Sequence, residues 1–89
     1  MISENVFVEN RSGLHARPAS ILVHMATKYA CDIRIRKGEK VCSAKSILQV
    51  LKMGIAAGTE ISVECDGEDE QEALDALITA IKGKLGETD

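Results

Sequence analysis

Aromatic residues, basic character and long apolar runs are all scarce in this sequence. One Phe, one Tyr and no Trp occur among 89 residues, so the hydrophobic core must be aliphatic. The net charge of -3 and the few aromatics argue against a nucleic-acid-binding surface, which needs a basic stripe and stacking side chains. No apolar run approaches the roughly 20 residues of a membrane-spanning helix. Residues 1–5 contain no basic segment followed by an apolar stretch, so we expect no signal peptide. We therefore expect a cytoplasmic protein that neither binds nucleic acid nor inserts into a membrane.

Cysteine pairs are lacking as well. The three cysteines, Cys31, Cys42 and Cys65, are odd in number, widely spaced and without a Cys-x-x-Cys motif. This pattern gives neither a disulfide framework nor a zinc signature. We expect three small buried residues in a reducing compartment, and neither a metal nor another cofactor.

The length bounds the architecture. Eighty-nine residues, of which 45% are hydrophobic, predict one globular domain over 1–89. A chain of this size hides only about 60–65% of the surface that its unfolded form exposes. One modest core follows, with no room for a deep enclosed active site.

Two periodicities predict the order of elements. Alternation of apolar and polar residues indicates strands at 2–8, 32–37, 41–42 and 60–65. Helical spacing indicates helices at 17–27 and 47–53, and a last helix whose apolar face runs from Leu74 to Leu85. The order β-α-β-β-α-β-α, with strands that have one wet face, favours the α/β (α+β) class. We predict an open-faced β-sandwich, a four-stranded antiparallel sheet with three helices on one face.

Two local contacts follow from the same reading. The outward residues of the second strand are arginines and those of the fourth are glutamates, so these strands attract each other if they are neighbours. Asp69 with Glu72 has the spacing of a capping box at the start of the last helix.

The most informative stretch is 13–19, Gly-Leu-His-Ala-Arg-Pro-Ala. Pro18 suits the first turn of a helix, which places His15 at the helix entrance. The backbone N–H groups there, of Ala16 and Arg17, have no intrahelical partner and favour an anion such as phosphate. The Arg17 guanidinium adds a forked cation for phosphate oxygens.

A histidine is largely uncharged, and hence nucleophilic, near neutral pH. The plain alternative is that His15 is only a polar cap, and His24 is too isolated to form a metal site with it.

A family resemblance strengthens the first interpretation. Residues 13–19 resemble the active-site motif of HPr, the histidine-containing phosphocarrier family of the bacterial phosphoenolpyruvate-dependent sugar phosphotransferase system. Residues 44–48 and 54–59 are similar to that family's second signature. The resemblance implies that enzyme I phosphorylates Nδ1 of His15 and that enzyme II A domains then accept the group. Arg17 would orient the phosphoryl group, and the protein would be a phosphorylated intermediate and not an independent enzyme. The matched His15 also excludes the regulatory paralogue in which that histidine is replaced.

The second block suggests regulation and docking. Ser46 precedes a helical run and suits an N-cap. The resemblance implies that a serine kinase, with a matching phosphorylase, acts on it in some relatives. Ile47, Leu48 and Leu51 form an apolar stripe that is either core or, as the resemblance implies, a partner-docking surface beside His15. We expect a monomer, which suits a carrier that meets several partners.

Two alternatives stay open at this point. The nitrogen-related branch of the same family shares the chemistry but has a regulatory output. A non-catalytic module that binds an anion or a partner protein would need no phosphoryl transfer at all. An independent enzyme is disfavoured, because the sequence has neither a nucleophile–base set nor a glycine-rich nucleotide loop.

Overall fold

The computed structural model describes residues 1–86, so the last three residues of the predicted 1–89 domain lie outside the described part. The predicted order of strands and helices is confirmed, with one short 3-10 turn added at the end. The elements are β1 (Ile2–Val8), α1 (Ala16–Ala26), β2 (Asp32–Lys37), β3 (Lys40–Ser43), α2 (Ile47–Lys52), β4 (Thr59–Asp66), α3 (Glu70–Lys82) and η1 (Lys84–Gly86).

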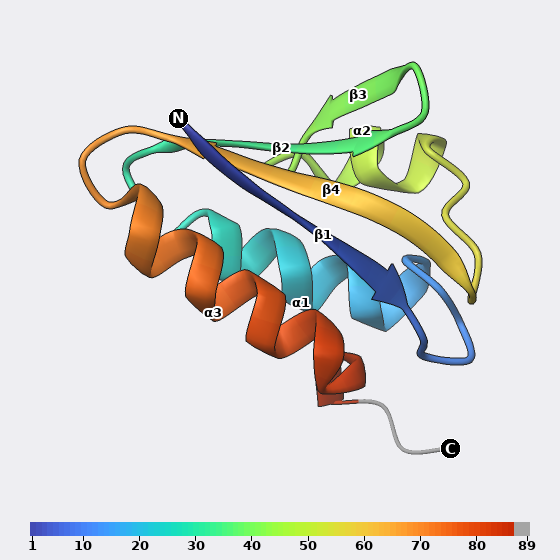
Figure 1. Ribbon diagram of the computed structural model, residues 1–89. Coiled ribbons are helices and arrows are strands. Elements are labelled where there is room, and N and C mark those ends of the chain that lie inside the picture. The colour runs from blue at the N-terminus through green and yellow to red at the C-terminus, as the bar shows by residue number, and fades with distance from the viewer. Residues whose placement is uncertain (87–89) are drawn as a thin grey trace.

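The four strands form one antiparallel sheet in the order β1-β4-β2-β3. The last strand in sequence, β4, therefore lies inside the sheet, between β1 and β2. Helices α1 and α3 lie side by side across one face, and α2 contacts α1 and β3 (Figure 1). The predicted open-faced sandwich is confirmed.

Strand alternation separates an aliphatic core from a wet face. Ile33, Ile35, Ile61 and Val63 are buried on the helix side, while the intervening polar side chains of β2 and β4 are exposed or half-buried. On the wet face the Arg36 Nε donates to Glu64 Oε2 at 2.9 Å. The expected attraction between the second and fourth strands is thus confirmed.

The predicted capping box at Asp69 is wrong. The Asp69 side chain makes no capping bond to α3, and its carboxylate accepts from the N–H groups of Ala30 at 2.8 Å and Cys31 at 2.9 Å. The pKa of Asp69 is lowered, mainly by the hydrogen bond from the Ala30 N–H and further by hydrogen bonds from Cys31. The Gly67 N–H instead donates to Glu70 Oε1 at 3.1 Å. The carboxylate therefore joins the α1–β2 loop to the β4–α3 turn.

The last helix is shorter than its apolar pattern predicts. Leu74, Leu77, Ile78 and Ile81 are buried on α3, which ends at Lys82. Leu85 is also buried, but it lies in η1 with a left-handed φ of +51°. A kink after Gly83 thus turns the final apolar side chain back onto the core.

The cysteines behave as expected. Cys31, Cys42 and Cys65 are free and buried, and burial is the main cause that raises the pKa of each thiol. Among residues 1–86 no group of His, Cys, Asp and Glu could hold a metal ion. Over the same residues, every helix is too short or too polar to cross a membrane.

Candidate functional site

The loop between β1 and α1 is fixed by a buried asparagine and a glycine. The Asn10 Nδ2 donates to the Gly13 carbonyl at 2.6 Å, and the Gly13 N–H donates back to the Asn10 carbonyl at 3.0 Å. Gly13 has a φ of +63°, and a Cβ there would collide with the Ile55 carbonyl oxygen. The Leu14 N–H donates to that same oxygen at 2.9 Å. The residues before His15 are therefore anchored on the segment that follows α2.

His15 stands at the N-cap of α1 with its side chain exposed. Its backbone is extended, with φ -124° and ψ 159°, and the imidazole makes no capping hydrogen bond. The interpretation of His15 as a polar cap therefore has no support in the geometry. The imidazole is open to a reacting partner.

The backbone next to the imidazole is strained. Ala16, the first residue of α1, has a φ of +49°. The left-handed region costs an L-residue with a Cβ roughly 1–2 kcal/mol. Strain of this kind concentrates at functional sites. Sequence reasoning missed it, because alanine gives no local signal for a left-handed conformation.

Arg17 supplies an unneutralised cation on the first turn of α1. It is exposed and takes part in none of the ion pairs found within residues 1–86. The first turn of α1 contains no acidic residue. The helix N-terminus also leaves its first N–H groups without intrahelical partners. Together, Ala16, Arg17 and the helix end favour an anion on or beside the imidazole.

Ser46 is the N-cap of α2, as predicted. Its Oγ accepts from the Gln49 N–H at 3.3 Å. The side chain is half-buried, and the exposed apolar side chains of α2 begin at the next residue.

The apolar stripe of α2 faces outward. Ile47 is 40% exposed, Leu48 60% and Leu51 37%, whereas Val50 is fully buried. The core interpretation is thus wrong for these three residues, and Val50 anchors the helix instead. Because α2 packs against α1, the exposed stripe lies on the same side of the sheet as the helix that carries His15.

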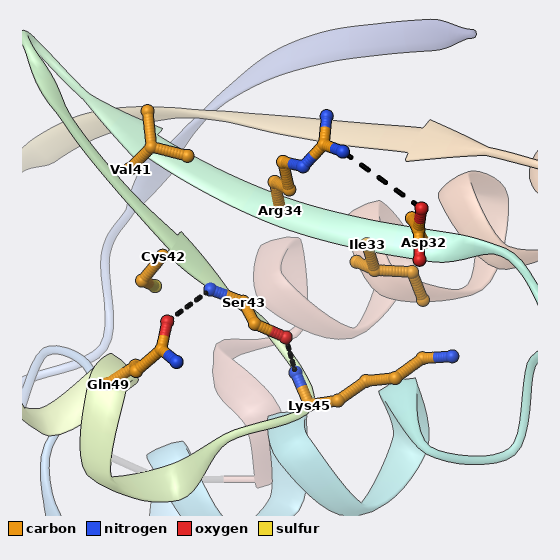
Figure 2. Close-up of a pocket in the computed structure, with 8 residues that line it drawn as sticks. All are labelled: Asp32, Ile33, Arg34, Val41, Cys42, Ser43, Lys45 and Gln49. Atoms are coloured by element: carbon orange, nitrogen blue, oxygen red, sulfur yellow. Dashed lines mark hydrogen bonds and ion pairs between the residues drawn. The ribbon is translucent and has the colours of Figure 1, made fainter.

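His15, Ala16 and Arg17 are all exposed at the surface. Two concavities of about 310 and 320 Å³ flank β3, and neither is lined by His15, Arg17 or Ser46; Figure 2 shows the residues around the first of them. An exposed imidazole is accessible to a substrate as large as another protein.

Comparisons with known proteins identify the family of this chain. The family described as "PTS HPr component phosphorylation site" matches residues 2–83. The "Phosphocarrier protein HPr" of Cupriavidus necator is 33% identical over 87 residues, which cover 98% of each chain. The "HPr-like protein Crh" of Bacillus subtilis is 37% identical over 85 residues, 96% of this chain and 100% of that one.

Solved structures give the same result. The crystal structure of HPr-C-His from Thermoanaerobacter tengcongensis superposes with a TM-score of 0.97 at 36% identity, and the match covers 100% of both chains. The structural similarity therefore covers all the strands and helices of the fold.

Proposed function

Because the chain belongs to the HPr family of phosphotransferase-system phosphocarriers, we propose that His15 carries the phosphoryl group in this protein. The observation that carries the proposal is the exposed imidazole at the N-cap of α1, which has no capping hydrogen bond and lies two residues before an unpaired arginine.

The proposed transfer proceeds from histidine to histidine. The lone pair on Nδ1 of His15 attacks the phosphorus of a phosphohistidine on enzyme I. A new N–P bond forms as the donor's N–P bond breaks, and the donor imidazole leaves with the electron pair. No net proton is needed, because a neutral imidazole enters on one side and a neutral imidazole leaves on the other.

The surroundings of His15 then hold the acquired charge. The N–H groups of Ala16 and Arg17 and the Arg17 guanidinium provide donors for phosphoryl oxygens. Each helix-end interaction is worth only about 0.3–1 kcal/mol at an exposed site. Modest stabilisation suits a carrier, since the group must leave again for an enzyme II A domain.

We assign docking of both partners to Ile47, Leu48 and Leu51 on α2. These are three of the six large hydrophobic side chains that are exposed in residues 1–86. Exposed apolar residues that gather on one short helix are typical of protein interaction sites. We place the carrier in the cytoplasm as a monomer, free to meet one partner after another.

Ser46 is proposed as a regulatory phosphorylation site for a serine kinase, reversed by a phosphorylase. A phosphate there would add about -1.5 to -2 charge units directly before the apolar stripe. Charge at the edge of an apolar docking surface weakens association by desolvation. We expect Ser46→Asp to slow phosphoryl transfer from enzyme I while Ser46→Ala transfers at the unmodified rate. Equal rates for the two variants would remove this regulatory role.

Incubation with enzyme I and phosphoenolpyruvate tests the main proposal. We expect one acid-labile, alkali-stable phosphoryl group per chain, lost in His15→Ala and kept in His24→Ala, the matched control. Label that persists in His15→Ala would contradict the proposal. If His15→Ala still performs the protein's cellular function, a non-catalytic binding module replaces the carrier.

The choice of branch depends on the acceptor. We favour sugar uptake, so the phosphoprotein should transfer its group to a sugar-specific enzyme II A domain. Transfer only to a nitrogen-type acceptor would place the protein in the regulatory branch with the same chemistry at His15.

A further inference from the structure

The outer edge of the sheet carries a recessed surface. Strand β3 is the terminal strand of the sheet, and the concavities of about 310 and 320 Å³ both include Val41, Cys42 and Gln49 in their walls. The two concavities therefore adjoin beside β3 and α2, and Figure 2 shows the residues around the first of them. We call the two adjoining concavities the β3 groove and define it by Val41, Gln49 and the four cations Arg34, Lys40, Lys45 and Lys52.

The β3 groove is basic on an acidic protein. The walls of the two concavities contain four cations, Arg34, Lys40, Lys45 and Lys52, and one carboxylate, Asp32. The chain as a whole carries a net charge of -3. Cations concentrated on one surface of an otherwise acidic protein attract acidic partners.

These cations are only weakly neutralised within the protein. Asp32 approaches Arg34 at 4.0 Å, the limit of an ion pair. Lys45 Nζ donates to the Tyr29 carbonyl at 2.7 Å, a contact that leaves its charge unbalanced. Lys40 and Lys52 belong to none of the ion pairs within residues 1–86. The charge of the groove is available to a ligand.

The edge of β3 offers backbone hydrogen bonds at one residue. The Ala44 N–H donates to the Ile33 carbonyl at 2.9 Å, so by antiparallel alternation Val41 and Ser43 direct their backbone groups to the outer edge. Those of Ser43 are occupied: its N–H donates to Gln49 Oε1 at 2.9 Å, and its carbonyl accepts from the Ser46 N–H at 3.3 Å. Only Val41, whose side chain is 42% exposed, keeps an edge-facing N–H and C=O for a partner.

We propose that the β3 groove binds an acidic, extended segment of a partner protein. The segment pairs with the backbone of Val41, as in strand addition to a sheet edge, and its carboxylates contact Lys40 and Lys52, which line the same concavity as Val41. At 100° per residue around α2, Gln49 lies on the opposite side from Ile47 and Leu51. The occupant of the groove therefore leaves those two side chains free, and binding does not depend on phosphorylation of His15.

Titration of the unphosphorylated, ¹⁵N-labelled protein with a short peptide of alternating Glu and Val tests this proposal. We expect the largest amide shifts at Val41 and its neighbours in β3, and slower hydrogen exchange of the Val41 amide. Lys40→Glu/Lys52→Glu should weaken binding at least about tenfold, because two attractive contacts become repulsive. Lys28→Glu/Lys82→Glu makes the same change in net charge outside the groove and should alter affinity by less than about twofold.

A second peptide separates strand addition from simple charge attraction. N-methylation of alternate peptide amides removes the hydrogen bonds to the edge and keeps the charge, so it should abolish the Val41 protection. The proposal fails if the unmethylated peptide does not bind, if both peptides bind alike, or if the shifts centre on Ile47 and Leu51. It also fails if an oligonucleotide of equal charge binds as tightly with the same shifts.

Discussion

At the scale of single residues, contacts across the sequence fix the loops that position the site. Asp69 bonds two N–H groups that lie 38 and 39 residues earlier. The spacing of Asp69 and Glu72 predicted a capping role for Asp69, because a local sequence pattern contains no information about hydrogen-bond donors so far away in the sequence. The left-handed conformation of Ala16 could not be predicted for the same reason. It is imposed by the anchored loop on one side and by α1 on the other. His15, Arg17 and Ser46, by contrast, lie where helix-start signals predict them.

The Asp69 contact predicts a pH dependence of stability. The hydrogen bond from the Ala30 N–H is the main cause that lowers the folded-state pKa of this carboxyl, so its stabilisation is present above the ordinary aspartate pKa and is lost as pH falls through the folded pKa. Asp69→Asn should lower the urea midpoint at pH 7 and flatten the decline of the midpoint below about pH 4. Urea titrations between neutral and acid pH measure both effects. A variant with an unchanged midpoint at pH 7 and an unchanged acid decline would show that the contact contributes nothing.

Gly13 predicts a steric requirement at the loop before His15. Gly13→Ala brings a Cβ into the Ile55 carbonyl at a φ of +63°, and we expect a loss of about 2–3 kcal/mol in the free energy of unfolding. Gly38→Ala is the matched control, since Gly38 has a φ of +60° and open space around it. Its cost should be about 1 kcal/mol, the conformational term alone. Equal losses in denaturant titration would mean that the collision at Gly13 is relieved without cost.

At the scale of elements, periodicity predicts which residues form helices and strands but not always which side of an element is buried. The alternation in β2 and β4 identified the buried faces correctly, because each strand has one clearly polar side. In α2 the apolar residues surround too much of a short helix for the burial side to be read from sequence. Val50 is buried while Ile47, Leu48 and Leu51 face outward, and only packing against α1 and β3 decides this.

This division of α2 predicts opposite effects of two substitutions. Val50→Ala should cost about 2 kcal/mol of folding stability, from lost apolar burial and a residual cavity. Leu48→Ala should change stability by less than about 0.5 kcal/mol and raise the KM for phosphoryl transfer from enzyme I. Thermal unfolding and transfer kinetics on both variants separate the roles. If Leu48→Ala destabilises the fold as much as Val50→Ala does, Leu48 is core and not a docking residue.

At the scale of the whole molecule, the fold class was predictable and the strand order was not. The sequence order of elements and the wet strand faces favour an open-faced sandwich, but β4 lies between β1 and β2 only because long-range pairing places it there. The resulting layer of helices exposes His15 and the α2 stripe on one side and leaves the β3 groove at the sheet's outer edge. His15 and the β3 groove are thus on different parts of the surface, since neither concavity of the groove is lined by His15.

The central claim is that Nδ1 of His15 receives and returns the phosphoryl group. Long-range ¹H–¹⁵N correlation of the histidine rings, recorded before and after incubation with enzyme I and phosphoenolpyruvate, tests this claim most directly. We predict that only the His15 ring changes, that its Nδ1 couples to ³¹P, and that the original spectrum returns when an enzyme II A domain is added. A ³¹P coupling on His24, or a His15 ring that is unchanged by the phosphorylated donor, would contradict the account.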